Sequence, residues 1–136
     1  MAELPDNVRK ALDEPNFWHL ATVNPDGSPQ SSTVWAGQRD GKIIFNTALG
    51  RKKPRNIEHD PRVALSLHKS ANGGYWSTSI QGKVVDTITG DQADKDIDDF
   101  AEKYIGQRPY PWRAPDERRV TFVIDPVHIA TMGDEA

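Results

Sequence analysis

Four cationic side chains gather in a short segment that follows an apolar strand. Arg51, Lys52, Lys53 and Arg55 lie at the start of a predicted short helix, which follows the strand 42–47 and a polar turn. A helix N-terminus already carries positive partial charge, so acidic residues are the usual choice there. Cations become favourable at this end when an anion such as a phosphate binds between them. The pattern predicts an anion-binding site, and the alternative is a solvated basic helix face.

Residues beside this basic segment have the chemical types that contact phosphate groups. Gly50 can adopt backbone angles that let the chain approach a ligand closely. Arg51 carries a planar fork that matches phosphate oxygens, and Lys53 adds a point charge. Asn46 and Thr47, at the end of the preceding strand, can supply neutral hydrogen bonds. We therefore predict that these residues belong to one binding site.

A second candidate feature is a row of small polar residues in a predicted strand. Residues 30–35 read Gln-Ser-Ser-Thr-Val-Trp, where a plain core strand would carry Val and Ile. Such a row leaves room for a flat ligand and offers hydrogen bonds to its heteroatoms. The alternative is a solvent-facing edge strand, because Thr is a good strand former.

Aromatic residues beside loops form a third candidate feature. Tyr75, Trp76, Tyr110 and Trp112 could form the wall of an apolar pocket or stack on a ring. Core packing or a dimer interface is the alternative, since both favour Trp and Tyr.

The sequence offers little support for other kinds of site. The four histidines include no i, i+3 or i, i+4 pair, so no metal site is predicted. We expect His19 to be packed within an apolar strand. There is no Ser nucleophile elbow, P-loop or Gly-x-Gly-x-x-Gly motif, and we assign no catalytic residue. Four aspartates along a predicted helix are expected to be solvated charge: Asp94, Asp96, Asp98 and Asp99.

Composition indicates one soluble domain spanning residues 1–136. The chain has no cysteine, which suits a reducing compartment, and we expect it to be cytoplasmic. A formal charge of −3 argues against general nucleic-acid binding. No stretch has the length of a membrane span, and the N-terminal residues lack the pattern of a signal peptide.

The order of elements predicts a mainly β protein with some α structure, of the α+β class. We expect six or seven mostly antiparallel strands that close into a barrel, since closure removes exposed sheet edges. We predict a helix over 91–105 with Asp91 as N-cap and Gly106 as its C-terminal glycine. Gly82 indicates a bulge or a close backbone approach. The predicted strands cover residues 17–24, 29–36, 42–47, 62–68, 75–86, 118–124 and 127–132; an opening helix ends before Pro15, and an ordered loop covers 107–117.

These motifs together resemble the pyridoxamine 5′-phosphate oxidase-like superfamily, along nearly the whole chain. Within it, the chain looks most like the small reductases that use the deazaflavin coenzyme F420. The segments that carry the resemblance are 17–23, 26–30, 34–35, 45–47, 50–53, 55–56, 60–65, 80–85 and 103–106.

The resemblance implies a split β-barrel homodimer with two cofactor sites at the subunit interface. In the family, the second strand lies along the flavin-like ring, and the cations after the third strand hold the cofactor phosphate. Lys52 then reaches the acidic tail of the coenzyme, and the partner subunit contributes Tyr75, Trp76 and the 107–119 loop. The implied ring contacts are Gln30, Ser32, Thr33, Val34 and Trp35, and the implied phosphate contacts are Gly50, Arg51 and Lys53.

Two departures from the larger oxidases shape the expected activity. The Arg-Leu ending typical of true pyridoxamine phosphate oxidases is missing, which argues against vitamin B6 oxidation. Ser32 stands where an FMN site uses an arginine. The resemblance therefore implies an oxidoreductase that transfers a hydride from reduced F420 to a conjugated small organic acceptor. The alternatives are an FMN-dependent oxidase or flavin reductase, and a non-catalytic protein that binds a flavin, deazaflavin or tetrapyrrole.

Overall fold

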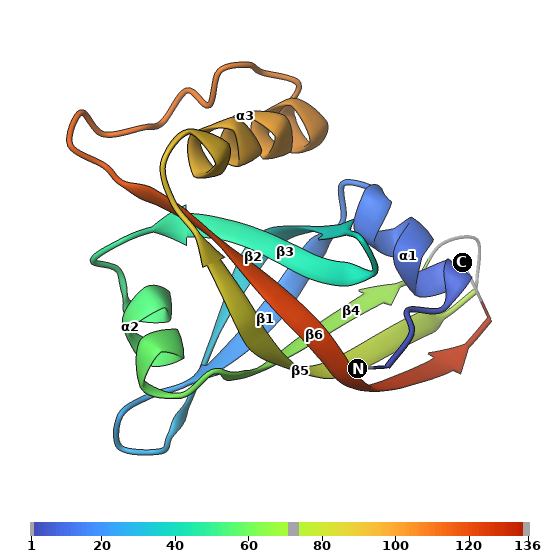
Figure 1. The fold of residues 1–136 in the computed structure, drawn as a ribbon. Coiled ribbons are helices and arrows are strands. Elements are labelled where there is room, and N and C mark those ends of the chain that lie inside the picture. Colours follow the sequence, from blue (N-terminus) through green and yellow to red (C-terminus); the bar gives the residue numbers. More distant parts are fainter. Residues whose placement is uncertain (1, 71–73, 135–136) are drawn as a thin grey trace.

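A computed structural model describes residues 2–70 and 74–134 of the chain (Figure 1). Six antiparallel strands form a closed barrel in the order β1-β2-β3-β6-β5-β4, which confirms the predicted mainly β barrel. The strands are β1 (Phe17–Val23), β2 (Pro29–Arg39), β3 (Lys42–Ala48), β4 (Arg62–Lys69), β5 (Trp76–Ile88) and β6 (Arg119–Gly133), and the helices are α1 (Asp6–Asp13), α2 (Lys52–His59) and α3 (Asp91–Ile105).

The core fills the inside of the barrel. Trp18, Phe45, Ile80 and Ile124 are almost fully buried and belong to one apolar cluster. The buried residues of α1, such as Leu12, belong to the same cluster, so this helix covers one end of the barrel. Burying a large apolar side chain contributes about 1.5–3 kcal/mol, so these positions dominate the stability of the fold.

A second, smaller cluster attaches α3 to the outside of the barrel. Ile97 and Phe100 on the helix pack against Ile44 of β3 and Val123 of β6. Trp35 and Tyr110 pack at the margin of this cluster. The helix ends at Gly106, whose φ of 67° confirms the predicted glycine C-terminus. It begins at Asp91, with Gly90 as N-cap and no side-chain cap bond, so the prediction of Asp91 as N-cap is wrong by one residue.

The short helix α2 is fixed to the barrel through Asn56, which is buried. The Asn56 amide donates hydrogen bonds to Thr22 Oγ1 and to Asn24 Oδ1, each at 3.0 Å. Before the helix, Gly50 has φ of 90°, in the left-handed region that glycine adopts most easily. The glycine turn and the Asn56 anchor therefore fix where the basic residues lie.

One long strand replaces the two C-terminal strands expected from the sequence. Proline normally ends a strand, because it has no N–H for the ladder. Here the pairing with β5 shifts between Gln81 and Gly82, so that Pro126 lies opposite Gly82 at an irregularity in the ladder. A Cβ at Gly82 would lie 2.5 Å from Ile124 Cγ2, which confirms the predicted close approach. The irregularity accommodates the proline, and β6 continues through it.

Residues 107–118 contain no helix or strand and run back across the outer side of α3, in accord with the predicted loop (Figure 1). Within the described part of the chain, no helix has the length and apolar character needed to cross a membrane.

A candidate anion-binding and cofactor site

A cavity of about 200 Å³ lies outside the barrel, where β2 and β3 meet α3 and the 107–118 loop. It brings together residues that are far apart in the sequence, including both sequence-predicted phosphate cations and part of the predicted ring strand. Its lining residues are Thr33, Val34, Trp35, Asn46, Thr47, Arg51, Lys53, Ile97, Tyr110, Trp112 and Arg119. We call this cavity the basic cavity.

Successive side chains of β2 point to opposite faces, so the residues that were predicted to lie along the cofactor ring are divided between two faces. Thr33 and Trp35 line the basic cavity, and Val34 between them also reaches it. Ser32 and Gln30 pair with residues whose side chains are buried, so they lie on the other face. Gln30 Oε1 accepts a hydrogen bond from Thr22 Oγ1 at 3.0 Å. The chain therefore does not bring Gln30 or Ser32 to the cavity.

Three cations face this cavity, and the sequence analysis missed one of them. Arg119 is the first residue of β6, and its side chain is only 3% exposed. Its Nε donates to Asn46 Oδ1 at 2.9 Å, and its guanidinium carbon lies 5.2 Å from the centre of the Tyr110 ring. Burial lowers the pKa of Arg119 from its ordinary value, while the Glu117 carboxylate opposes that shift. Arginine stays protonated in proteins, so the cavity holds a fixed positive charge.

Lys53 gives the cavity a second kind of cation. Burial lowers the pKa of Lys53, and the neighbouring Arg51 charge lowers it further. Among the described residues, no acidic side chain forms an ion pair with Lys53. A half-buried ammonium beside an arginine is stabilised by a bound anion. This arrangement fits a phosphate better than it fits a plain solvated surface.

Glu117 lies between two of the cations. Its Oε1 accepts a hydrogen bond from Arg51 Nη2 at 2.9 Å, and its Oε2 lies 3.2 Å from Arg119 Nη1. The Glu117 side chain is 7% exposed. The contact with Arg119 is an ion pair, but it does not meet the geometry of a hydrogen bond. The sequence analysis did not identify Glu117, because its partner Arg51 is 66 positions away.

Aromatic rings form the apolar wall of the cavity. Trp35 stacks on Tyr104 with ring centres 5.1 Å apart, which fixes its orientation. Tyr110 meets the Trp35 ring edge-on at 6.2 Å, and Trp112 lies 6.4 Å from it. The Trp112 ring is 62% exposed, so it is available for contact with a ligand. Flat faces beside fixed cations can accommodate a ring that carries an anionic chain.

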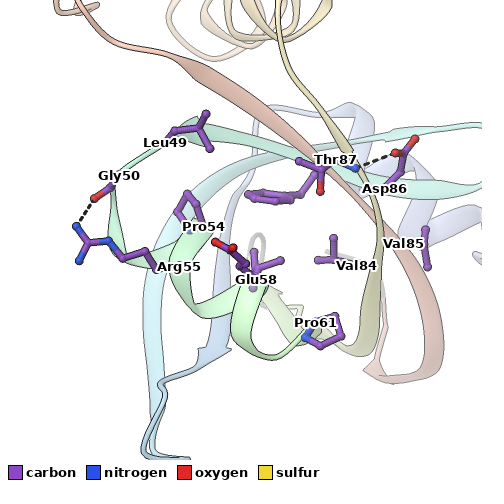
Figure 2. Close-up of a pocket in the computed structure, with 12 residues that line it drawn as sticks. Leu49, Gly50, Pro54, Arg55, Glu58, Pro61, Val84, Val85, Asp86 and Thr87 are labelled. Carbon is purple, nitrogen blue, oxygen red and sulfur yellow. Dashed lines mark hydrogen bonds between the residues drawn. The ribbon is translucent and has the colours of Figure 1, made fainter.

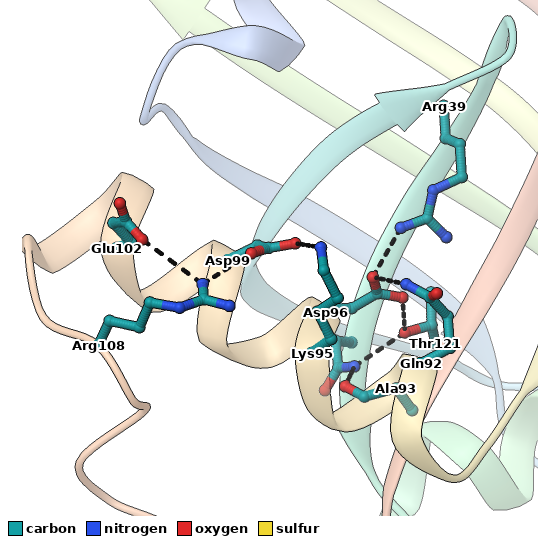
Figure 3. A network of polar contacts seen from close by, with 10 residues as sticks. Arg39, Gln92, Ala93, Lys95, Asp96, Asp99, Glu102, Arg108 and Thr121 are labelled. Carbon is teal, nitrogen blue, oxygen red and sulfur yellow. Dashed lines mark hydrogen bonds and ion pairs between the residues drawn. The ribbon is translucent and has the colours of Figure 1, made fainter.

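A buried polar network holds Arg119 in place, and Figure 3 shows the part of it around Asp96. Asp96 is buried and accepts hydrogen bonds from Arg39 at 2.7 Å and from Thr121 at 2.8 Å. Thr121 Oγ1 in turn accepts from the Asn46 amide at 2.9 Å, and Asn46 holds Arg119. The network thus runs continuously from Arg39 to the basic cavity.

The four aspartates of α3 that were predicted to be solvated differ in exposure, and all four have partners. Asp96 is buried, which contradicts the prediction, whereas Asp99 is exposed. Asp94 pairs with Arg113 at 2.7 Å. Asp99 pairs with Arg108 at 2.7 Å (Figure 3). Asp98 accepts a hydrogen bond from the Tyr110 backbone N–H at 2.9 Å. These contacts bind the 107–118 loop to the helix of its own chain. Tyr110 and Trp112 of the loop line the cavity of their own chain. The contribution of a partner subunit that the resemblance implies stays a prediction.

The remaining predicted site residues lie elsewhere in the chain. Lys52 is exposed on α2 and does not line the basic cavity. Trp76 is 2% exposed and belongs to the barrel core. Tyr75 lies on the outer face of the barrel, in a separate depression that also includes His19. His19 is exposed there, so the expectation that it packs in an apolar environment is wrong.

Gly50 lines a different and larger depression of about 530 Å³ between α2 and the end of β5 (Figure 2). Its one cation, Arg55, donates to the Gly50 carbonyl at 2.8 Å, and Glu58 lies in the same depression. Asp86 also lines this depression, so its two carboxylates outnumber its one cation. The basic cavity has an excess of positive charge and aromatic walls, so we take it as the better candidate for binding an anionic cofactor.

Two buried polar atoms of the basic cavity also lack a hydrogen bond. Thr47 Oγ1 has no hydrogen-bond partner in the structure, and Arg119 Nη1 has only its ion-pair contact with Glu117. Buried polar groups are nearly always bonded, so such atoms indicate places for a ligand or water. The donor set fits a phosphate-bearing cofactor. Among the described residues, no group of three or more His, Asp or Glu side chains could hold a metal ion.

A family profile and individual relatives assign the chain to the same protein family. The sequence profile of the pyridoxamine 5′-phosphate oxidase family matches residues 4–133. A pyridoxine/pyridoxamine 5′-phosphate oxidase from Rubrobacter xylanophilus is 34% identical over 103 residues, which cover 75% of this chain and 42% of that protein. The corresponding enzyme from Cupriavidus taiwanensis is 29% identical over 119 residues, covering 83% of this chain and 51% of that protein. The chain thus spans about half the length of these curated relatives.

Among solved structures, an F420 reductase superposes with a TM-score of 0.79 at 30% identity, covering 93% of this chain and 98% of that chain. An FMN-binding protein from Nostoc punctiforme, related to pyridoxamine 5′-phosphate oxidase, superposes with a TM-score of 0.61 at 19% identity. That alignment covers 92% of this chain and 78% of the other, and at this identity it shows the fold alone.

Proposed function

Because the chain belongs to the pyridoxamine 5′-phosphate oxidase family, we propose that it is an oxidoreductase that uses reduced coenzyme F420. In this proposal a hydride passes from the deazaflavin to a conjugated small organic acceptor. The observation that carries the proposal is the basic cavity, where Arg51 and Lys53 lie beside Thr33 and Trp35. The likeness to an F420 reductase over nearly the whole of both chains supports the choice of cofactor.

The residues of the cavity divide into two groups with different roles. Arg51 and Lys53 hold the cofactor phosphate by charge-assisted hydrogen bonds, and Asn46 and Thr47 supply neutral ones. Thr33 and Trp35 lie along the ring, and Lys52, just outside the cavity, reaches the acidic tail. When bound, the reduced deazaflavin supplies the hydride. The protein orients the ring against the acceptor and excludes water, and this chemistry needs no catalytic dyad.

We further propose that the single barrel domain acts as a cytoplasmic homodimer. A cavity of about 200 Å³ is smaller than the usual ligand pocket of about 300–1,000 Å³, so one chain encloses only part of the cofactor. Apolar residues remain exposed on the outer barrel face, including Val127 at 61% and Met132 at 68%. A second copy packed on this face would cover them and bring Tyr75 and the Trp76 segment to the cofactor. Size-exclusion chromatography with light scattering tests this point, and a monomer of 15.2 kDa would contradict it.

An FMN-dependent oxidase or flavin reductase is the second candidate. The names of the matching relatives favour it, since they are pyridoxine/pyridoxamine 5′-phosphate oxidases at up to 34% identity. Two observations weigh against FMN. The chain has Ser32 in place of an arginine, and FMN lacks the acidic tail that would pair with Lys52.

A side-by-side titration of the purified protein with F420 and FMN tests the proposal, with ligand fluorescence as the readout at physiological salt. We expect F420 to bind with micromolar or tighter affinity and FMN to bind more weakly. Reduction of quinones and enones by reduced F420 would then be measured. Preference for FMN would move the protein to the oxidase class. Tight F420 binding without reduction of any acceptor would indicate a carrier instead.

A further inference from the structure

Glu117 does not line the basic cavity itself, but it contacts two cations that do, Arg51 and Arg119, and this has a consequence for ligand binding. Its carboxylate lies between Arg51 and Arg119, at 2.9 Å and 3.2 Å from their terminal nitrogens. This is the place that an anionic ligand group would take if it used both arginines. We propose that Arg119 is a third cation of the phosphate site, and that Glu117 is an internal anion which the phosphate displaces. This inference rests on the proposed function for the identity of the ligand.

The geometry of the pair makes Glu117 an incomplete partner for the cations. Glu117 Oε1 accepts a hydrogen bond from Arg51, whereas Oε2 and Arg119 Nη1, both buried, form an ion pair at 3.2 Å that does not meet the geometry of a hydrogen bond. Lys53 lines the same cavity and forms no ion pair with Glu117 within the described residues. A phosphate has more acceptor oxygens than a carboxylate and can bond all three cations together. The incoming group therefore satisfies donors that Glu117 leaves open.

The charges also favour replacement of the Glu117 carboxylate by phosphate over binding of phosphate beside it. Arg51, Lys53 and Arg119 carry three positive charges, and Glu117 carries one negative charge. A phosphate placed beside a retained carboxylate would meet like-charge repulsion in a partly buried site. If Glu117 turns outward, the phosphate meets all three cations without this repulsion.

The surroundings of Glu117 allow such a movement. Glu117 lies in the 107–118 loop, which has no helix or strand, and one backbone hydrogen bond joins its N–H to the Ala114 carbonyl at 3.1 Å. Arg119, by contrast, is fixed by Asn46 and by the Tyr110 ring. The cations thus stay in place while the carboxylate exchanges. Glu117 therefore lowers the apparent affinity of the site for phosphate, in proportion to the fraction of time that its carboxylate is bound to the arginines.

The substitution Glu117→Gln tests the proposal, because the two possible roles of Glu117 predict opposite changes in phosphate affinity. An internal competitor predicts that the variant binds phosphate more tightly than the wild-type protein, by about five- to tenfold. A carboxylate that merely holds the arginines in position predicts weaker binding. Glu58→Gln is the matched control, since it makes the same change on an exposed residue outside the cavity. It is expected to leave binding unchanged.

Binding is measured with inorganic phosphate and, separately, with F420, against chloride at equal ionic strength. Tryptophan fluorescence reports phosphate binding, because Trp35 and Trp112 line the cavity. Arg119→Lys keeps the charge but loses the fork, and it should weaken binding of both ligands while the protein remains folded. Equal or weaker phosphate binding by Glu117→Gln overturns the proposal. If this variant binds phosphate more tightly but does not bind F420, the result supports displacement of Glu117 by phosphate and contradicts F420 as the cofactor.

Discussion

Thr121 Oγ1 on β6 donates a buried hydrogen bond of 2.8 Å to Asp96 Oδ2 on α3, and this contact joins the helix to the barrel. The Asp96 side chain has no exposure to solvent, and it also accepts from Arg39 at 2.7 Å. Through Thr121 and Asn46 the same network reaches Arg119 in the basic cavity. The stability of α3 and the order of the cavity therefore depend on one carboxylate.

Replacing this carboxylate should destabilise the protein strongly. Asp96→Ala leaves the Thr121 hydroxyl and the Gln92 amide without their acceptor, and we expect a loss of about 2–3 kcal/mol in the free energy of unfolding. Denaturant unfolding measures the loss. Asp99→Ala, on the exposed side of the same helix, is the control and should cost about 1 kcal/mol or less. Equal effects at the two positions would contradict the role assigned to the network.

The cations of the basic cavity should contribute to cofactor binding individually. Lys53→Met removes a charge-assisted contact of about 1.5–3 kcal/mol, so F420 should bind roughly 10- to 100-fold more weakly. Fluorescence titration measures the change. Lys83→Met is the control, because Lys83 is exposed on β5 and outside the cavity. Binding of F420 to the Lys53 variant with wild-type affinity would show that the phosphate lies elsewhere.

The parts of the fold and site that local patterns determine could be predicted from the sequence. Strand alternation and turn residues gave the antiparallel barrel, and the helix end at Gly106 followed from local backbone preference. The basic segment was recognisable because its charges are adjacent, and two of its four cations, Arg51 and Lys53, do line one cavity. Gly82 was recognisable because few other reasons place a glycine within a strand.

The parts that depend on contacts between distant segments could not be predicted in the same way. Glu117 and Arg119 acquire their role from Arg51 and Asn46, and nothing near them in the sequence indicates those partners. Five residues of β2 were predicted together as ring contacts, but only Thr33, Val34 and Trp35 line the cavity, because the side chains of Gln30 and Ser32 lie on the other face. Tertiary contacts also decided whether acids such as Asp94 were solvated or paired.

The close approach at Gly82 gives a third prediction. Gly82→Ala places a methyl group 2.5 Å from Ile124 Cγ2 and 2.9 Å from the Asp125 carbonyl oxygen. Because part of this contact is backbone, we expect a loss of about 1–3 kcal/mol in unfolding free energy. At Gly37 an added methyl group would meet Phe100 ring atoms at 3.3 Å, which can shift slightly. Gly37→Ala should therefore cost less, and the reverse order would contradict the packing of β5 on β6.

Lys103 gives a prediction about pH. Its Nζ donates to the Leu12 and Ala36 carbonyls, at 2.6 Å and 2.8 Å, and so connects α3 with α1 and β2. Burial lowers the pKa of Lys103 from 10.5 to about 8. In the unfolded chain the amine therefore keeps its proton at pH values where the folded protein has lost it. Folding stability rises with pH wherever the unfolded state binds more protons, so the contribution of Lys103 should increase between about pH 8 and 10.

The neutral amine still has two N–H groups for the two carbonyls, so the connection survives deprotonation. We expect the wild-type protein to gain stability relative to Lys103→Met as the pH rises from about 7.5 to 9.5, below the range in which tyrosines titrate. Thermal unfolding of both proteins across this range measures the difference in slope. Because only the slopes with pH are compared, a constant difference in stability between the variant and the wild-type protein does not affect the result. Parallel curves would show that Lys103 is solvated well enough to keep an ordinary pKa.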